Sequence, residues 1–219
     1  MNISKKIWRG FAGILILAAL IISFVGQVTA PEIQSYCGRI LGYFSYFTEY
    51  SNILVMLWLF NNSLLNRRIK FLNKRSIRGA ITLYIIVAGI VFFLVLNNAW
   101  NQEGIAKIES YILHGFAPVA FVADWIIFGE KGKYKYKDIK VWVIFPIIYL
   151  FVALIIGKII GVYPYPFLDL NSITIGGFLN YLVYLIIAFI GLSFIIVLID
   201  KIFFKFGIAR NANETLEFS

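Results

Sequence analysis

Six long apolar segments alternate with short polar ones along the chain. They run from about Trp8 to Val28, Ile40 to Leu64, Gly79 to Asn98, Ser110 to Phe128, Val141 to Ile160 and Gly176 to Asp200. A helix needs about 20 apolar residues to cross about 30 Å of hydrocarbon. The segments lack the alternation of barrel strands, and lipid cannot satisfy an open backbone. The pattern therefore predicts an all-α polytopic membrane protein, a six-transmembrane-helix bundle.

These segments use nearly all of the 219 residues, which are 61% hydrophobic and 14% charged. We predict a single transmembrane domain over residues 1–200 and a polar cytoplasmic tail over 201–219, with no soluble domain. The first segment resembles a signal peptide. It is long for one, however, and Pro31 would directly follow the cleavage position. We expect it to remain as the first span.

Basic charge is concentrated in alternate gaps between the apolar segments. Of the 20 Lys and Arg residues, 17 fall before or at the start of the first segment, between the second and third, between the fourth and fifth, or after the sixth. Only Arg39, Lys107 and Lys158 lie in the other gaps or beside them. Basic loops remain cytoplasmic, so both termini are predicted inside. The richness in Ile, Lys, Asn and Tyr indicates a bacterial plasma membrane.

The placement of charge and the counts of cysteine and histidine exclude several classes of function. The net charge of +9 lies in short loops beside apolar spans, which indicates contact with membrane lipids and no nucleic acid. Cys37 and His114 are the only residues of their types, so clusters of cysteines or histidines around a metal are excluded. We expect neither a metal nor another cofactor. The oligomeric state stays open.

The second segment carries the densest set of polar residues. Ser45, Thr48, Glu49 and Asn52 fall within about 100° of a helix surface, and Ser51 lies just beyond. Such residues can simply bond neighbouring helices or their own backbone. A stripe that includes a carboxylate also fits a functional site.

The fourth segment contains His114, Gly115 and Pro118. A lone histidine can bond a neighbouring helix or serve in a site. Pro118 removes the hydrogen bond to the His114 carbonyl, so we expect a kink there. Gly115 allows another helix to approach closely.

Depth places several of these groups together. Thr48 lies about 12 Å and His114 about 6 Å below the outer starts of their predicted spans. Asn97 and Asp169 belong to the same side. The aromatic and proline-rich loop Tyr163–Phe167 is either a rigid connector or a cap over an outer cavity.

The remaining acidic residues have simpler expectations. Asp124 and Asp200 lie near inner span ends and should pair with basic loop residues. Glu49 is either a proton carrier or a partner of Arg39.

A hydroxyl and an imidazole at similar depth are the minimum for nucleophilic acyl transfer. An oxyanion would also need a donor, such as Asn52 or a backbone N–H. Glu49 and Asp169 are candidates to orient the ring, as the carboxylate of a triad does.

Three sequence patterns add a resemblance. They are the segment Tyr43–Leu54, the run His-Gly-Phe-Ala-Pro at 114–118 followed by Asp124-Trp125, and YPYPFLD at 163–169. Together they resemble the bacterial "Pr-six-Pr" family of six-helix membrane proteins. More distantly, the chain is similar to the androgen-induced and androgen-dependent animal proteins, which are intramembrane threonine hydrolases that cleave fatty acid esters of hydroxy fatty acids. The resemblance implies Thr48 as nucleophile and His114 as base.

The sequence thus leads to the hypothesis of an intramembrane Thr/His hydrolase that acts on lipid esters from the outer half of the bilayer. Ser51 and Asn52 would support Thr48, with Glu49, Asn97 and Asp169 as further site residues. The alternative is a small-molecule-binding or transport module, such as the substrate-binding subunit of a vitamin transporter. A scaffold without a ligand is a third interpretation.

Overall fold

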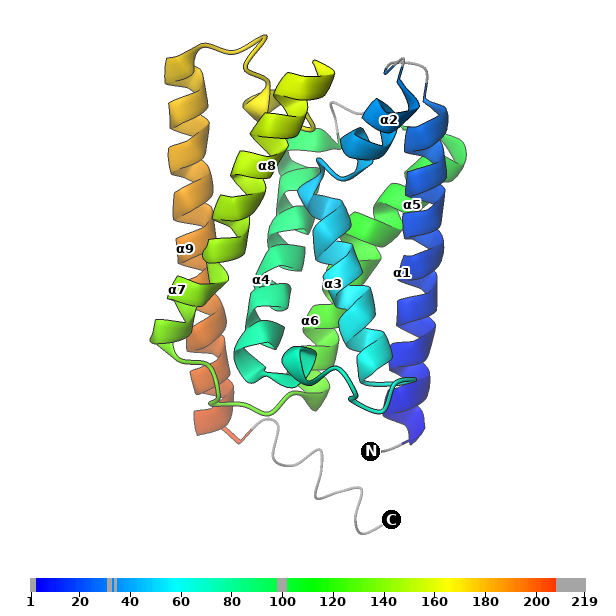
Figure 1. Ribbon diagram of the computed structural model, residues 1–219. Coiled ribbons are helices and arrows are strands. Elements are labelled where there is room, and N and C mark those ends of the chain that lie inside the picture. The colour runs from blue at the N-terminus through cyan, green and yellow to red at the C-terminus, as the bar shows by residue number, and fades with distance from the viewer. Residues whose placement is uncertain (1–2, 31–32, 34, 98–101, 208–219) are drawn as a thin grey trace.

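The computed structural model describes residues 3–30, 33, 35–97 and 102–207 as a bundle of helices (Figure 1). None of the described residues forms a strand. The α-helices are α1 (Ile3–Thr29), α2 (Tyr36–Tyr43), α3 (Phe47–Asn61), α4 (Arg75–Val91), α5 (Gly104–Tyr111), α6 (Ala117–Phe128), α7 (Ile139–Trp142), α8 (Ile144–Ile160) and α9 (Ile175–Lys205). Short π-helical segments follow α4 (Phe92–Leu96) and join α5 to α6 (Ile112–Phe116). The all-helical prediction is confirmed for the described residues.

Five helical stretches among the described residues have the length and composition to cross a membrane. They are Ile3–Thr29, Arg75–Leu96, Gly104–Phe128, Tyr136–Ile160 and Ile175–Lys205. These match five of the six predicted segments. The last helix continues to Lys205, past the predicted end at Asp200. Asn98 and residues 208–219 of the predicted tail lie outside the described residues.

The second predicted segment differs from expectation. A single helix over Ile40–Leu64 is wrong, because the chain leaves the helical path between Tyr43 and Phe47. The 15 residues of α3 span about 22 Å, less than the roughly 30 Å of a hydrocarbon core. The sequence gives no usual signal of this break, since Phe44–Tyr46 contains neither glycine nor proline.

Tyrosine hydroxyls satisfy the backbone that the break opens. Tyr50 donates to the carbonyl of Phe44 at 2.7 Å, and Tyr149 of α8 donates to the carbonyl of Ser45 at 2.7 Å. An apolar surrounding offers no water for such groups, so unpaired carbonyls there would cost several kcal/mol each. The fold therefore stabilises the break with specific hydrogen bonds.

Helices α3 and α4 run through the middle of the bundle, with α1 on one side and α8 and α9 on the other (Figure 1). One apolar core joins α3 and α4 to α8 and α9 through residues such as Phe47, Tyr84, Tyr149 and Val197. A second core joins them to α1 and α6 through residues such as Ile16 and Phe121. Groups on α3 therefore have protein on both sides.

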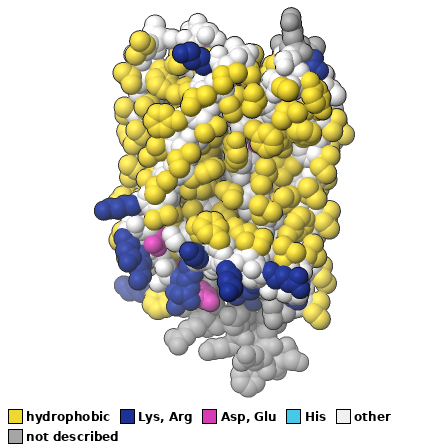
Figure 2. Space-filling model, viewed as in Figure 1, with side chains coloured by type: hydrophobic (Ala, Val, Ile, Leu, Met, Phe, Trp, Pro, Cys, Tyr) yellow, Lys and Arg dark blue, Asp and Glu magenta, His cyan; other side chains and the backbone are white. Residues whose placement is uncertain are grey.

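Basic side chains gather at the end of the bundle where α1 begins and α9 ends (Figure 2). At this end the buried carboxylate of Asp124 accepts from Arg9 at 2.8 Å and from Arg78 at 2.6 Å. The predicted pairing of Asp124 with basic residues is confirmed. Asp200 instead accepts from the backbone N–H of Tyr134 at 2.9 Å. These contacts tie α1, α4 and α6 together at the basic end.

Candidate active site

Thr48 and His114 are in hydrogen-bond contact. Thr48 lies in the first turn of α3, directly after the break, and His114 lies in the π-helical segment Ile112–Phe116. The Thr48 Oγ1 atom is 3.1 Å from His114 Nε2. Each residue is only 5% exposed. A hydroxyl and an imidazole that lie 66 residues apart in sequence thus form a buried pair.

The second ring nitrogen fixes the direction of this hydrogen bond. His114 Nδ1 lies 2.9 Å from the carbonyl oxygen of Ser110. A carbonyl can only accept, so Nδ1 carries the proton in the neutral ring and Nε2 accepts from Thr48. The ring of Phe92 stacks on the imidazole with centroids 4.0 Å apart and planes at 14°. The imidazole is therefore held in the orientation and tautomer of a base for Thr48.

Two π-helical segments meet around His114. The segment that contains His114 ends just before Pro118, and the other, which begins at Phe92, supplies the stacking ring. The distortion that the sequence predicts near Pro118 is thus a π-helical turn. A Cβ atom on Gly89 of α4 would lie only 2.9 Å from the His114 carbonyl oxygen. Glycine at this position lets α4 pack closely against the turn that carries the imidazole.

The neighbouring polar residues of α3 have distinct partners. Ser51 donates to the Phe47 carbonyl of its own helix at 2.8 Å. Asn52 uses its amide group to bond the carbonyls of Thr48 at 3.0 Å and Leu113 at 3.2 Å. It therefore bridges the backbones beside the nucleophile and the base. Because both amide hydrogens are used in this way, Asn52 does not fit the role of oxyanion donor.

Glu49 points toward α1 and away from Arg39. Its Oε1 atom accepts from Ser23 at 2.9 Å. Arg39 instead donates to the backbone carbonyls of Ile33 at 2.6 Å and Val28 at 3.1 Å. Of the two alternatives for Glu49, the pairing with Arg39 is wrong, because the Arg39 guanidinium instead joins α2 to the carbonyls of Ile33 and of Val28 at the end of α1.

Asp169 and Asn97 are not joined to the Thr–His pair by a hydrogen bond among the described residues. Asp169 stabilises its own turn, accepting from the N–H of Asn171 at 3.0 Å and from the hydroxyl of Ser172 at 2.6 Å. Asn97 is half-buried directly after the π-helical end of α4. The ring of the base is oriented by a backbone carbonyl, where the sequence suggested a carboxylate.

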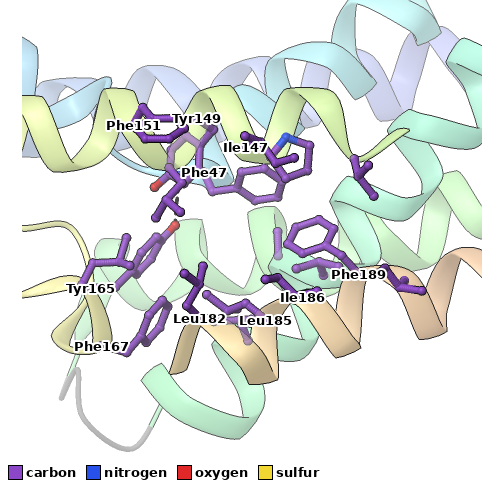
Figure 3. A pocket seen from close by; sticks show the side chains of 18 of the residues that line it. Phe47, Ile147, Tyr149, Phe151, Tyr165, Phe167, Leu182, Leu185, Ile186 and Phe189 are labelled. Carbon is purple, nitrogen blue, oxygen red and sulfur yellow. Dashed lines mark hydrogen bonds between the residues drawn. The ribbon is translucent and has the colours of Figure 1, made fainter. Parts of the chain in front are cut away.

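Thr48 lines a cavity of about 570 Å³. The cavity lies between α3, α4, α8 and α9, and its walls are almost entirely apolar (Figure 3). It reaches the surface of the bundle beside exposed apolar side chains of α8 and α9. These side chains are Ile147, Phe151, Ile186 and Ile190. The volume falls within the range of about 300–1,000 Å³ that is usual for small-molecule sites.

Tyr165 closes one end of the cavity beside Thr48. It comes from the aromatic loop between α8 and α9, and its ring projects toward Phe47 and Tyr149 (Figure 3). Its hydroxyl accepts from the Phe47 N–H at 3.0 Å. Burial raises the pKa of Tyr165 to about 12, against the opposing effect of the polar groups of Thr48 and Phe47 nearby. The loop stands out in the sequence, but nothing there distinguishes Tyr165 from its aromatic neighbours Tyr163 and Phe167.

The described residues contain no group of three or more His, Cys, Asp and Glu placed to hold a metal ion. No protein-family model, curated protein or solved structure matches the chain. The described residues form an all-helical bundle, and its long apolar helices are compatible with an integral membrane protein. Its buried Thr–His pair and adjoining apolar cavity define a candidate site within the bundle.

Proposed function

We propose that this protein is an intramembrane hydrolase that cleaves lipid esters with Thr48 as nucleophile and His114 as general base. One observation carries the proposal. The Thr48 hydroxyl donates to an imidazole nitrogen at 3.1 Å and also lines an apolar cavity. The distant resemblance to intramembrane threonine hydrolases favours the same two roles.

The proposed reaction has two halves. In the first, His114 Nε2 takes the proton of Thr48 as Oγ1 bonds to the ester carbonyl carbon. The tetrahedral intermediate then collapses, the bond to the alcohol oxygen breaks, and His114 gives that oxygen the proton. In the second half, water attacks the acyl-threonine, loses a proton to His114 and releases the fatty acid, and the proton returns to Thr48.

The cavity supports a lipid as substrate. Its lining offers apolar contact over most of its surface and few polar atoms besides those of Thr48, Tyr149 and Tyr165. The exposed apolar side chains at its edge would face acyl chains in a membrane. An acyl chain can then enter the protein sideways without passing through water, because both environments are apolar.

The orientation of the chain forms part of the proposal. We infer that the basic end of the bundle faces the cytoplasm of a bacterial plasma membrane, as the positive-inside rule requires (Figure 2). Both termini would then be inside. Thr48 and His114 would lie in the outer half of the bilayer, as the sequence hypothesis holds.

Purified protein in lipid nanodiscs tests the proposal with chromogenic acyl esters. We expect hydrolysis by the wild type and a fall of at least about 1,000-fold in kcat for Thr48→Ala, as for removal of a nucleophile. Thr48→Ser keeps the hydroxyl and should retain measurable activity.

Ser51→Ala is the matched control. It also removes one buried hydroxyl from α3, but that hydroxyl bonds only its own helix. Its activity should stay within about threefold of the wild type, since no group of the reaction is lost. Absence of ester hydrolysis by the wild type, or equal activity of the Thr48→Ala and Ser51→Ala proteins, would contradict the proposal.

The cavity also supports a second candidate, a binding or transport module. Its apolar lining favours an acyl chain over a water-soluble vitamin as ligand. A binding module would retain a fluorescent fatty acid equally in the wild type and Thr48→Ala proteins and would hydrolyse no ester. Hydrolysis that depends on Thr48 would exclude binding alone.

A further inference from the structure

Acyl transfer at Thr48 needs a hydrogen-bond donor for the negative oxygen of the tetrahedral intermediate. Such donors contribute most when they are fixed in a water-excluded site before the reaction begins. Asn52 is not free for this task, because its amide hydrogens bond two backbone carbonyls. The donor must therefore come from another group that faces the cavity beside Thr48.

Tyr165 is the polar side chain that meets these conditions most closely. It lines the same cavity as Thr48 and is only 5% exposed. Its hydroxyl accepts from the N–H of Phe47, the residue directly before Thr48, at 3.0 Å. A carbonyl carbon at attack distance, about 3–3.5 Å from Oγ1, would bring its oxygen within reach of the same hydroxyl.

We propose that Tyr165 is a catalytic residue whose phenolic O–H donates to the carbonyl oxygen of the ester and stabilises the oxyanion. This inference rests on the hydrolase function proposed above. It assigns a chemical role to the aromatic loop between α8 and α9. The proton stays on Tyr165 throughout, so the proton balance of the two half-reactions does not change.

The N-terminal end of α3 makes the Tyr165 hydroxyl a stronger hydrogen-bond donor. The Phe47 N–H lies in the first turn of α3, where backbone N–H groups have no partner within the helix, and it donates to the Tyr165 oxygen. A hydroxyl that accepts one hydrogen bond becomes a stronger donor of its own. The positive end of the helix dipole also favours the developing negative charge. The raised pKa of Tyr165, about 12, keeps the phenol protonated at neutral pH.

Tyr165→Phe tests the assignment, with Tyr84→Phe as its matched control. Both substitutions remove one buried phenol that bonds the backbone, but the Tyr84 hydroxyl donates to the Trp142 carbonyl at 2.7 Å, and Tyr84 is not among the residues that line the cavity. We expect Tyr165→Phe to lower kcat by about 100-fold or more with little change in KM, as for loss of one oxyanion donor. Tyr84→Phe should stay within about threefold of the wild type.

The outcomes separate the two proposals. Activity in the wild type with equal kcat for Tyr165→Phe and Tyr84→Phe would overturn the role of Tyr165 and leave the hydrolase intact. A wild type without ester hydrolysis would overturn both. Thermal unfolding of each variant shows whether a lower kcat accompanies a folded protein.

Should Tyr165→Phe fail to fold, a ring-fluorinated tyrosine introduced at position 165 keeps the side chain's shape and makes the phenol more acidic. The alkaline fall of kcat should then move to lower pH than in the wild type, since the ionised phenol cannot donate. The same replacement at position 84 should leave the profile unchanged. An unchanged profile for position 165 would overturn the assignment, because a purely structural tyrosine has no effect on the pH at which kcat falls.

Discussion

Backbone carbonyls, more than charged groups, hold Thr48 and His114 in contact. The Ser110 carbonyl fixes the proton on the far nitrogen of the imidazole. The Asn52 amide joins the Thr48 carbonyl to that of Leu113, the residue before His114. In an apolar interior such neutral contacts are stable without the desolvation cost of an ion pair.

Asn52→Ala tests this bridge. It removes two hydrogen bonds from buried carbonyls, so we expect the free energy of unfolding to fall by about 1–3 kcal/mol. Ester hydrolysis should also fall, because the backbones of nucleophile and base are no longer tied. Thermal unfolding in detergent and nanodisc assays measure the two effects, and Ser51→Ala is again the control. A stability equal to that of Ser51→Ala would contradict the bridging role.

At the scale of helices, the site depends on three departures from regular α-helix. The break before α3 places Thr48 in a first turn, and π-helical segments carry Phe92 and His114. Such π-helical turns are frequent at functional sites, since they redirect side chains that a regular helix would aim elsewhere. Close packing of α4 at Gly89 holds one of these turns in place.

Gly89→Ala tests that packing. Its Cβ would lie 2.9 Å from the His114 carbonyl oxygen, so α4 or the turn must shift. We expect a loss of about 1–3 kcal/mol in the free energy of unfolding and a clear drop in hydrolysis.

Gly191→Ala in α9 is the control, because nothing lies within 4 Å of its new methyl group. A helical glycine replaced by alanine without a clash gains up to about 1 kcal/mol. Equal stability and activity of the two variants would show that the contact at Gly89 does not matter.

At the scale of the whole molecule, charge and the candidate site lie in different parts of the bundle. Basic residues gather where α1 begins and α9 ends, whereas α2 and the break that precedes Thr48 lie toward the opposite end (Figures 1 and 2). The positive-inside rule then gives the site an outward position.

The single cysteine tests this orientation. Cys37 in α2 is exposed, so a membrane-impermeant maleimide added to intact cells should label the wild type. A Cys37→Ala protein that carries Lys133→Cys in a loop at the basic end should be labelled only after the membrane is permeabilised. The reverse pattern would contradict the proposed orientation.

Sequence patterns predicted much of this architecture but not its irregular parts. Long apolar runs predict helices well, because a segment in lipid must pair its own backbone N–H and C=O groups, and a helix does so. They cannot report the break at Phe44–Tyr46, because the hydroxyls that satisfy its open backbone come from Tyr50 and Tyr149, which lie outside it. Tyr165 was likewise hidden, because its partner Phe47 lies 118 residues away in sequence.

The site itself was only partly predictable. Thr48 and His114 stood out as polar groups in apolar segments, and depth placed them on one side. Contact between them depends on the packing of α3 against the π-helical segment, which no local pattern encodes. Asp169 shows the opposite case, since a carboxylate at suitable depth is used in its own turn.

Mapping of a covalent adduct is the most direct test of Thr48 as nucleophile. Protein in nanodiscs is treated with an alkyl fluorophosphonate, digested and analysed by mass spectrometry. The account predicts a single modified site at Thr48, formed in the wild type and in Ser51→Ala and lost in Thr48→Ala. Absence of any adduct in the wild type, or an adduct that persists in Thr48→Ala at another residue, would contradict it.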